Sequence, residues 1–408
     1  MNALRPKADG TLPFLPYGRQ IIEDDDIAAV AEALAGDYLT TGPLVTRFEA
    51  ALCEAVKAEH AVVCSNGTAA LYMAAKVLGL GPGSTVIVPS ITFLATASAP
   101  HLAGAEIVFA DVDPDSGVMR PGDLEAALRR AGGKADAVFN VHLNGQCGAV
   151  EAIAQIARQH GLKIVDDAAH AIGTRYRIGG AEKSVGENAL SDLTCFSFHP
   201  VKTVTMGEGG AVTANKPEWA EALRLVRSHG MTRDPALFET EADAFESEGM
   251  ANPWYYELTE PGFNWRATDI QCALGLSQLA KLTRFTARRR ALAAAYDSLL
   301  APLAPLVAPV AHTDCVPTLH LYPVLIDFAA AGLTRAAVMS GLGAQGIGSQ
   351  VHYYPVHRQR YYAARYGKTE LAGADRYYAR TLSLPYFASM AISDVARVVD
   401  SLKRVLGL

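Results

Sequence analysis

A lysine that follows an apolar stretch is the first residue whose surroundings suggest chemistry. Lys202 ends the segment Phe196-Ser-Phe-His-Pro-Val-Lys202 and precedes Gly207, Gly209 and Gly210. Most lysines are solvated surface residues. Burial at this position would lower the pKa of the amine and favour its neutral form, which attacks carbonyl carbons. The surroundings of Lys202 therefore favour a Schiff-base nucleophile.

A pair of carboxylates ends another apolar run. Asp166 and Asp167 follow Lys163-Ile-Val, and His170 lies three residues after Asp167. Open α/β sheets bind ligands at the carboxyl ends of their strands. Because side chains alternate in direction along an extended chain, at most one of the two carboxylates points into such a site. Ordinary capping by these aspartates is the alternative interpretation.

The third segment, Ser65-Asn66-Gly67-Thr68, joins a short apolar strand to a helix. Free N–H groups and a hydroxyl at a helix start suit an anion such as phosphate, although simple capping explains the same residues. An anion site, a carboxylate able to hold a pyridinium proton and a reactive lysine are together what pyridoxal 5'-phosphate (PLP) requires, because its protonated ring withdraws electrons. The three segments together predict a PLP site.

The elements that must position these residues alternate between strands and helices. The predicted strands before residue 215 are 61–64, 85–88, 106–110, 137–143, 163–166, 193–198 and 210–214. Repeated strand–helix units imply a mostly parallel sheet covered on both faces. After residue 262 come two helical patterns, a proline-rich connector and a smaller α/β region with predicted strands at 320–326 and 349–353. We therefore expect a large domain over residues 1–262, with an N-terminal arm, and a small domain over 263–408.

Composition excludes several classes of protein. The chain of 408 residues is 50% hydrophobic, and 36 basic against 42 acidic residues give a net charge of −6. This balance argues against intrinsic disorder and against general binding of nucleic acid or anionic membranes. The six cysteines lie far apart, with no zinc-ligand spacing, so we expect no metal. No apolar signal segment or membrane span is evident, which indicates a cytoplasmic protein.

Several motifs resemble those of the DegT/DnrJ/StrS-type PLP-dependent sugar aminotransferases. They are SNGTAAL, Thr92-Phe93, DDAAHAIG, FSFHPVK with GEGG, GFNWR and ALGLSQL, in the family's order over nearly the whole chain. PYGRQ, LTTGP, LHLYPV and VHYYPVH are similar to the pseudaminic-acid branch, which aminates C4 of a UDP-linked 4-keto-6-deoxy-N-acetylhexosamine. The resemblance implies PLP-transferase fold type I, like aspartate aminotransferase, with the large parallel-sheet domain and smaller C-terminal domain outlined above.

The resemblance also implies a role for each matching residue. Lys202 would bind PLP covalently and shuttle a proton, Asp167 would hold the pyridinium nitrogen, and His170 would lie near the cofactor's phenolic oxygen. The other implied cofactor contacts are Gly67, Thr68, Phe93, Ser197 and Asn264, the last reaching the neighbouring subunit's cofactor in a homodimer with shared active sites. The implied substrate-binding residues are Tyr17, Thr40, His352, Tyr353 and Tyr354.

The expected reaction is amino transfer, with glutamate as the donor, to a keto-sugar nucleotide. Two alternatives remain open: a different keto-sugar nucleotide as substrate of the same kind of enzyme, and a non-catalytic PLP-binding protein. Dehydratase-like relatives carry histidine in place of the Schiff-base lysine, and Lys202 argues against that class.

Overall fold

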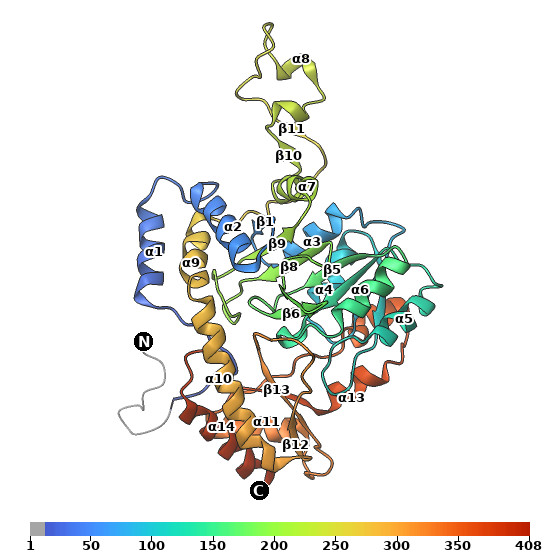
Figure 1. Ribbon diagram of the computed structural model, residues 1–408, viewed down its shortest axis with the longest axis vertical. Coiled ribbons are helices and arrows are strands. Elements are labelled where there is room, and N and C mark those ends of the chain that lie inside the picture. Colours follow the sequence, from blue (N-terminus) through green and yellow to red (C-terminus); the bar gives the residue numbers. More distant parts are fainter. Residues whose placement is uncertain (1–12) are drawn as a thin grey trace.

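A seven-stranded sheet forms the centre of the larger body in the computed structural model, which describes residues 13–408 (Figure 1). Its strands, in spatial order, are β1 (His60–Cys64), β9 (Gly210–Ala214), β8 (Leu193–Ser197), β5 (Lys163–Asp167), β4 (Ala137–Val141), β2 (Thr85–Pro89) and β3 (Glu106–Ala110). Only β9 runs antiparallel to its neighbours in this sheet. The predicted parallel sheet is confirmed, and the ends of its strands differ from the prediction by at most two residues.

Helices cover both faces of this sheet because its strands bury side chains in both directions. In β1, Val62 packs in the cluster that contains α3 (Gly67–Val77), whereas the neighbouring Val63 packs in the cluster that contains α2 (Pro43–Val56). The first face also carries α4 (Ala95–Leu102) and α7 (Pro217–Arg227). The second face also carries α5 (Pro121–Arg130) and α6 (Val150–Gln159).

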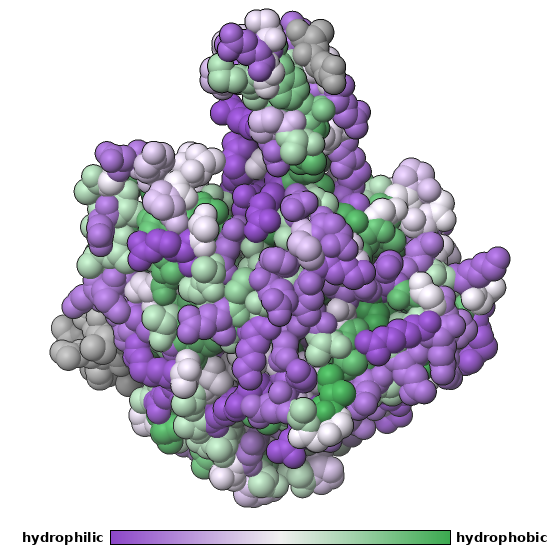
Figure 2. Space-filling view, turned by 45° about the horizontal axis from the view of Figure 1, so that its top comes forward, coloured by the Kyte–Doolittle hydropathy of each residue, from purple (hydrophilic) through white to green (hydrophobic). Residues whose placement is uncertain are grey.

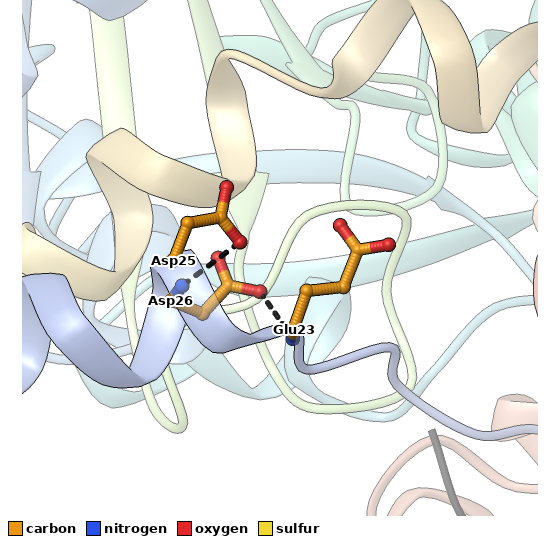
Figure 3. A group of neighbouring side chains, drawn as sticks. All are labelled: Glu23, Asp25 and Asp26. Carbon is orange, nitrogen blue, oxygen red and sulfur yellow. Dashed lines mark hydrogen bonds between the residues drawn. The ribbon is translucent and has the colours of Figure 1, made fainter.

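Ion pairs hold the first helix, α1 (Asp24–Ala35), beside α9 (Asp269–Leu279). The carboxylates of Glu23, Asp25 and Asp26 gather at the start of α1 (Figure 3). Lys281 Nζ lies 3.3, 2.6 and 2.8 Å from them, respectively. Burial alone would raise the pKa of Asp26, but the hydrogen bonds from Lys281, Ser277, Gln278 and the N–H of Glu23 together outweigh burial, and the pKa is lowered. The ammonium group therefore supplies the positive charge that these carboxylates need.

A second body forms around a three-stranded antiparallel sheet of β12 (Val307–Pro309), β13 (Tyr322–Ile326) and β14 (Thr381–Leu384). Its core includes residues of α10 (Leu282–Leu300), α11 (Arg335–Ala344) and α14 (Ile392–Leu406). Leu15 belongs to the same core. The domain division at 262/263 stays a prediction, and α9, which follows it, packs on α1 and α2.

The strand expected at 349–353 is wrong. Gln350 forms an isolated bridge with Ser383, and the residues after it follow an irregular path. A strand covered on one face alternates buried and exposed side chains, but His352 and Tyr353 are consecutive and both face polar partners. The sequence patterns also gave no sign of β6 (Arg175–Ile178), β7 (Ala181–Ser184), α12 (Arg360–Tyr366) and α13 (Ala372–Arg380).

A hairpin projects away from both bodies (Figure 1). It consists of β10 (Met231–Thr232), the short helix α8 (Glu241–Ala244) and β11 (Glu257–Leu258). Apolar side chains are visible on its surface (Figure 2), and the exposed ones are Leu237, Met250, Trp254, Tyr256 and Leu258. Exposed apolar patches of this kind mark interaction surfaces. Within residues 13–408, none of the helices combines the length and hydropathy that crossing a membrane requires.

Candidate active site

A cavity of about 880 Å³ lies at the carboxyl ends of β4, β5 and β8, where residues from both bodies line it. Eleven of the thirteen predicted site residues line this cavity: Tyr17, Gly67, Thr68, Phe93, Asp167, His170, Ser197, Lys202, His352, Tyr353 and Tyr354. The fold therefore brings together segments that lie more than 300 residues apart in the sequence. Thr40 and Asn264 lie outside the cavity.

Lys202 lies on the loop after β8, and its N–H donates to the carbonyl of His199 at 2.9 Å. The side chain lines the cavity, and the surrounding protein shields the amine from bulk water. Burial lowers the pKa of Lys202 to about 8, against an opposing effect of the Asp167 carboxylate. A neutral amine is therefore accessible near physiological pH.

Asp167 and Asp166 point to different surroundings. Asp167 lines the cavity, and its carboxylate accepts hydrogen bonds from Thr96 Oγ1 at 2.6 Å and from the N–H of Ala169 at 3.1 Å. Burial raises the pKa of Asp167, although both hydrogen bonds favour the ionised form. Asp166 does not line the cavity, and its Oδ1 lies 3.3 Å from Nε2 of His142. The alternation of strand β5 thus selects Asp167 as the carboxylate that can meet a ligand.

Both ring nitrogens of His170 have hydrogen-bond partners. The N–H of Asn144 donates to Nδ1 at 3.2 Å, and Nε2 lies 3.1 Å from the hydroxyl of Tyr353. Burial keeps the pKa of His170 well below its usual value. Because a backbone N–H can only donate, the neutral ring carries its proton on Nε2. His170 is therefore a hydrogen-bond donor toward Tyr353, and its ring packs 4.4 Å from that of His320.

The start of α3 forms an anion cradle at one end of the cavity. Asn66 Oδ1 caps the helix by accepting from the N–H of Ala69 at 2.8 Å, and the first N–H groups of a helix have no intrahelical acceptor. A Cβ on Gly67 would lie 2.9 Å from Cβ of Ser197, and one on Gly210 would lie 2.3 Å from the carbonyl oxygen of Asn66. The two glycines therefore allow the N-terminal end of α3 to lie close to strands β8 and β9. Capping and anion binding are compatible here.

Phe93 offers an aromatic face inside the cavity. The side chain is 53% exposed although it lines the cavity, and its ring lies 6.1 Å from that of Tyr353. An apolar ring exposed at this position can pack against a flat ligand ring.

Thr40 and Asn264 are exposed residues outside the cavity. Thr40 bridges to Thr268, four residues after Asn264. Asn264 is exposed near the base of the projecting hairpin, and its Oδ1 accepts from the N–H of Arg266 at 3.2 Å. Neither residue lines the cavity of its own chain, whereas Trp265, the neighbour of Asn264, does.

Two residues of the site were missed by the sequence analysis. Thr96, which donates to Asp167, lies in α4, whose helical pattern Pro100 obscured. His320 lines the cavity and lies within LHLYPV, a segment whose residue types and spacing alone indicate no chemical role. Thr92 lies before α4, so no helical spacing in the sequence signals the contact of Thr96 with Asp167.

The chain belongs to the DegT/DnrJ/EryC1/StrS aminotransferase family, whose model matches residues 20–403. It is 36% identical over 396 residues to the spore coat polysaccharide biosynthesis protein SpsC of Bacillus subtilis (strain 168), covering 96% of this chain and 97% of SpsC. The family resemblance deduced from the motifs is confirmed.

Solved structures agree with this assignment. PseC of Helicobacter pylori, an aminotransferase involved in the biosynthesis of pseudaminic acid, superposes with a TM-score of 0.86 at 28% identity, over 97% of this chain and 99% of that chain. The putative sugar aminotransferase Spr1654 of Streptococcus pneumoniae, in its PMP form, superposes with a TM-score of 0.84 at 26% identity, over 96% and 99%. The predicted PLP-transferase fold type I is confirmed.

The protein is therefore a PLP-dependent aminotransferase. Its own residues fit the cofactor: Gly67 lets the start of α3, with its free N–H groups, lie close to the Ser197 hydroxyl, Asp167 offers a carboxylate, and Lys202 offers an amine with a lowered pKa. The donor set matches what the cofactor requires.

Proposed function

We propose that the enzyme transfers an amino group from glutamate to C4 of a UDP-linked 4-keto-6-deoxy-N-acetylhexosamine, in a pathway similar to pseudaminic acid biosynthesis. The observation that carries this proposal is that Lys202 and Asp167 share one cavity with a wall of polar aromatic side chains, Tyr17, His352 and Tyr353. The volume of about 880 Å³ is near the upper end of the range for ligand sites, so the cavity suits a cofactor together with a sugar.

The chain's residues have separate tasks at the cofactor end. Bound PLP supplies an electron-withdrawing ring that accepts the electron pair of a breaking C–H bond. Asp167 would keep a proton on the ring nitrogen, because a carboxylate there stabilises the cation. Gly67, Thr68 and Ser197 would bind the phosphate at the positive end of α3, and Phe93 would pack on the ring.

Lys202 would then move the protons. An amine with a pKa of about 8 can accept a proton and return it near neutral pH. We assign to Lys202 the removal of the proton from Cα of glutamate and the delivery of a proton to C4 of the sugar. His170 would donate its single Nε2 proton to the cofactor's phenolic oxygen in place of the Tyr353 hydroxyl, as its tautomer allows.

The opposite wall would bind the sugar nucleotide. His352 Nδ1 pairs with Ser383 Oγ at 2.8 Å, and burial lowers the pKa of His352 to about 3. A neutral histidine beside Tyr17, Tyr353 and Tyr354 provides uncharged hydrogen-bonding groups and ring faces, which suit sugar hydroxyls and an N-acetyl group. The likeness to PseC supports the choice of this sugar class.

We also propose a homodimer with shared active sites. Asn264 and Thr40 are exposed and lie outside the cavity of their own chain, and Asn264 bridges to Ser228 just before the projecting hairpin, which exposes apolar side chains. In a two-fold dimer, the same surface of each chain would meet its partner, and these residues would complete the partner's cavity. Asn264 would contact the phosphate there. A cytoplasmic location stays a prediction.

Product analysis tests the reaction. The purified holoenzyme is incubated with glutamate and a panel of UDP-4-keto sugars, and the product masses are read. Amination of the 6-deoxy-N-acetyl sugar supports the proposal. Preference for another keto-sugar nucleotide would retain the enzyme class and replace the substrate. If glutamate leaves the absorbance of the bound cofactor unchanged, the protein does not catalyse amino transfer. Substituting Tyr354→Phe should raise the KM for the sugar and leave the glutamate half-reaction nearly intact.

Chain mixing tests the shared site. Lys202→Ala and Asn264→Ala chains should each be inactive alone. After random exchange, half of the dimers are mixed, each with one intact site, so the mixture should regain about one-quarter of full activity. Wild type mixed with a Lys202→Ala/Asn264→Ala chain is the matched control: its mixed dimers have no intact site, so its activity should fall from about one-half to about one-quarter of full activity as the chains exchange. A monomeric active enzyme, or no rescue after demonstrated exchange, contradicts the shared site.

A further inference from the structure

A buried turn behind the cavity has an unusual backbone. Asn144 lies in the short 3-10 turn Leu143–Gly145 that follows β4, with φ of 59° and ψ of 17°. It is 2% exposed and does not line the cavity. Left-handed backbone at a non-glycine residue carries strain, and such residues cluster at functional sites because the surrounding contacts hold them in place.

Three hydrogen bonds hold Asn144 between two parts of the site. Its N–H donates to Nδ1 of His170 at 3.2 Å. Its side-chain Oδ1 accepts from the N–H of Leu321 at 2.6 Å, and its carbonyl accepts from the N–H of His320 at 3.4 Å. Asn144 thus connects the histidine that follows β5 to the segment that leads into β13 of the second body.

The neighbouring glycine leaves the turn little freedom. A Cβ on Gly145 would lie 2.2 Å from the carbonyl oxygen of Thr318 and 3.0 Å from that of His170. The backbone is therefore packed against both segments, and the side chain of Asn144 supplies the acceptor that Leu321 needs. Removing that acceptor leaves a buried N–H without a partner, and the least costly relaxation moves the turn and the N–H that faces His170.

We propose that Asn144 is a positioning residue that fixes the ring orientation and the Nε2-protonated tautomer of His170 from behind the cavity. The inference rests on the proposed role of His170 at the cofactor. Asparagine suits this position because its short side chain offers an acceptor and it tolerates left-handed backbone.

Three substitutions separate the effect of the Asn144 side-chain acceptor from those of backbone conformation and of general stability. Asn144→Gly keeps the backbone conformation and removes the acceptor, whereas Asn144→Asp keeps both. Thr174→Val is the matched control, because the hydrogen bonds of Thr174 Oγ1 go to Gly145 and Thr318, at 2.9 Å each, in the same buried network and not to His170. The first readout is the pH midpoint of the bound-cofactor absorbance, since a donor at the phenolic oxygen favours its ionised form.

Asn144→Gly should raise that midpoint by about half a pH unit or more. Its kcat should fall about tenfold while the KM for glutamate stays within about twofold, because misplacement affects the reacting geometry more than binding. Asn144→Asp should stay close to wild type, and Thr174→Val should lower the melting temperature without moving the midpoint. If Asn144→Gly only lowers the melting temperature, as Thr174→Val does, the proposal is overturned.

A double-mutant cycle with His170→Gln decides whether Asn144 acts through His170. In the His170→Gln background, Asn144→Gly should cause no further shift of the midpoint. If Asn144→Gly shifts the midpoint as much in the His170→Gln background as in wild type, the positioning role of Asn144 is overturned. If His170→Gln itself leaves the midpoint unchanged, the role of His170 at the cofactor is overturned, and this inference with it. Failure of the proposed sugar substrate would appear separately, as a wild-type enzyme that reacts with glutamate and aminates none of the sugars.

Discussion

The rate at which the amine of Lys202 binds PLP covalently should depend on pH, because burial lowers the pKa of this amine. At pH 7 a lysine with a pKa of about 8 is neutral in about one molecule in ten, whereas a lysine with the ordinary pKa of 10.5 is neutral in about one in 3,000. The cavity therefore enriches the reactive amine about 300-fold at neutral pH. The rate of covalent capture of PLP by the apoenzyme should rise about tenfold per pH unit and level off near pH 8.

The assay is stopped-flow absorbance of apoenzyme mixed with PLP between pH 5.5 and 10, followed by borohydride reduction and peptide mapping. Asp167→Asn should lower the midpoint, because the Asp167 carboxylate raises the pKa of Lys202. Asp166→Asn is the matched control, since Asp166 faces away from the cavity. A midpoint near 10, a label on another lysine, or a larger shift in Asp166→Asn than in Asp167→Asn would refute the reasoning.

Three further changes test the support of the site and of the fold. Thr96→Val removes a hydrogen bond to the Asp167 carboxylate worth about 1.5–3 kcal/mol, so the acid limb of the pH profile of kcat/KM should move up by about 1–2 units. Gly210→Ala would place Cβ 2.3 Å from a main-chain oxygen at the start of α3, and urea titration should show a loss of about 1–3 kcal/mol, whereas Gly343→Ala, which meets nothing within 4 Å, should not destabilise. Lys281→Met leaves the buried carboxylate of Asp26 without its cation, and the free energy of unfolding should fall by about 3–5 kcal/mol at pH 7. The lowered pKa of the buried carboxylate means that its stabilisation is present above pH 3.8 and is lost as the pH falls through the folded-state value, so the Lys281→Met difference should shrink in acid.

The sequence predicted the sheet well because its strands carry continuous apolar runs. In β4, all five residues are buried, and β9 has the predicted bounds. A continuous apolar run is enough to predict a strand where both faces of that strand are covered. Local pattern was insufficient at 349–353, where Gln350 forms only an isolated bridge, and His352 and Tyr353 each pair with a polar side chain from a distant segment.

The candidate site could be predicted where a local motif carries the chemistry. Lys202 and Asp167 follow strands that end at the same edge of the sheet, so their meeting follows from topology. Thr96 and Asn144 could not be found in this way, because each acts through a hydrogen bond to a residue far along the chain. Such contacts depend on how separate loops pack against one another, which local patterns do not contain.

The position of Leu15 in the core of the second body has a consequence for how the chain folds during synthesis. Its N–H donates to the carbonyl of Gly346 at 2.8 Å, and it bridges to Ile347. At about 5–20 residues per second, the ribosome takes roughly 15–70 s to make the intervening chain. Leu15 therefore leaves the ribosome early and waits, without its native neighbours, until almost the whole protein has been made. Because the second body can complete its core only after this delay, the larger body has time to fold first, and the N-terminal segment then closes the structure from the opposite end of the chain.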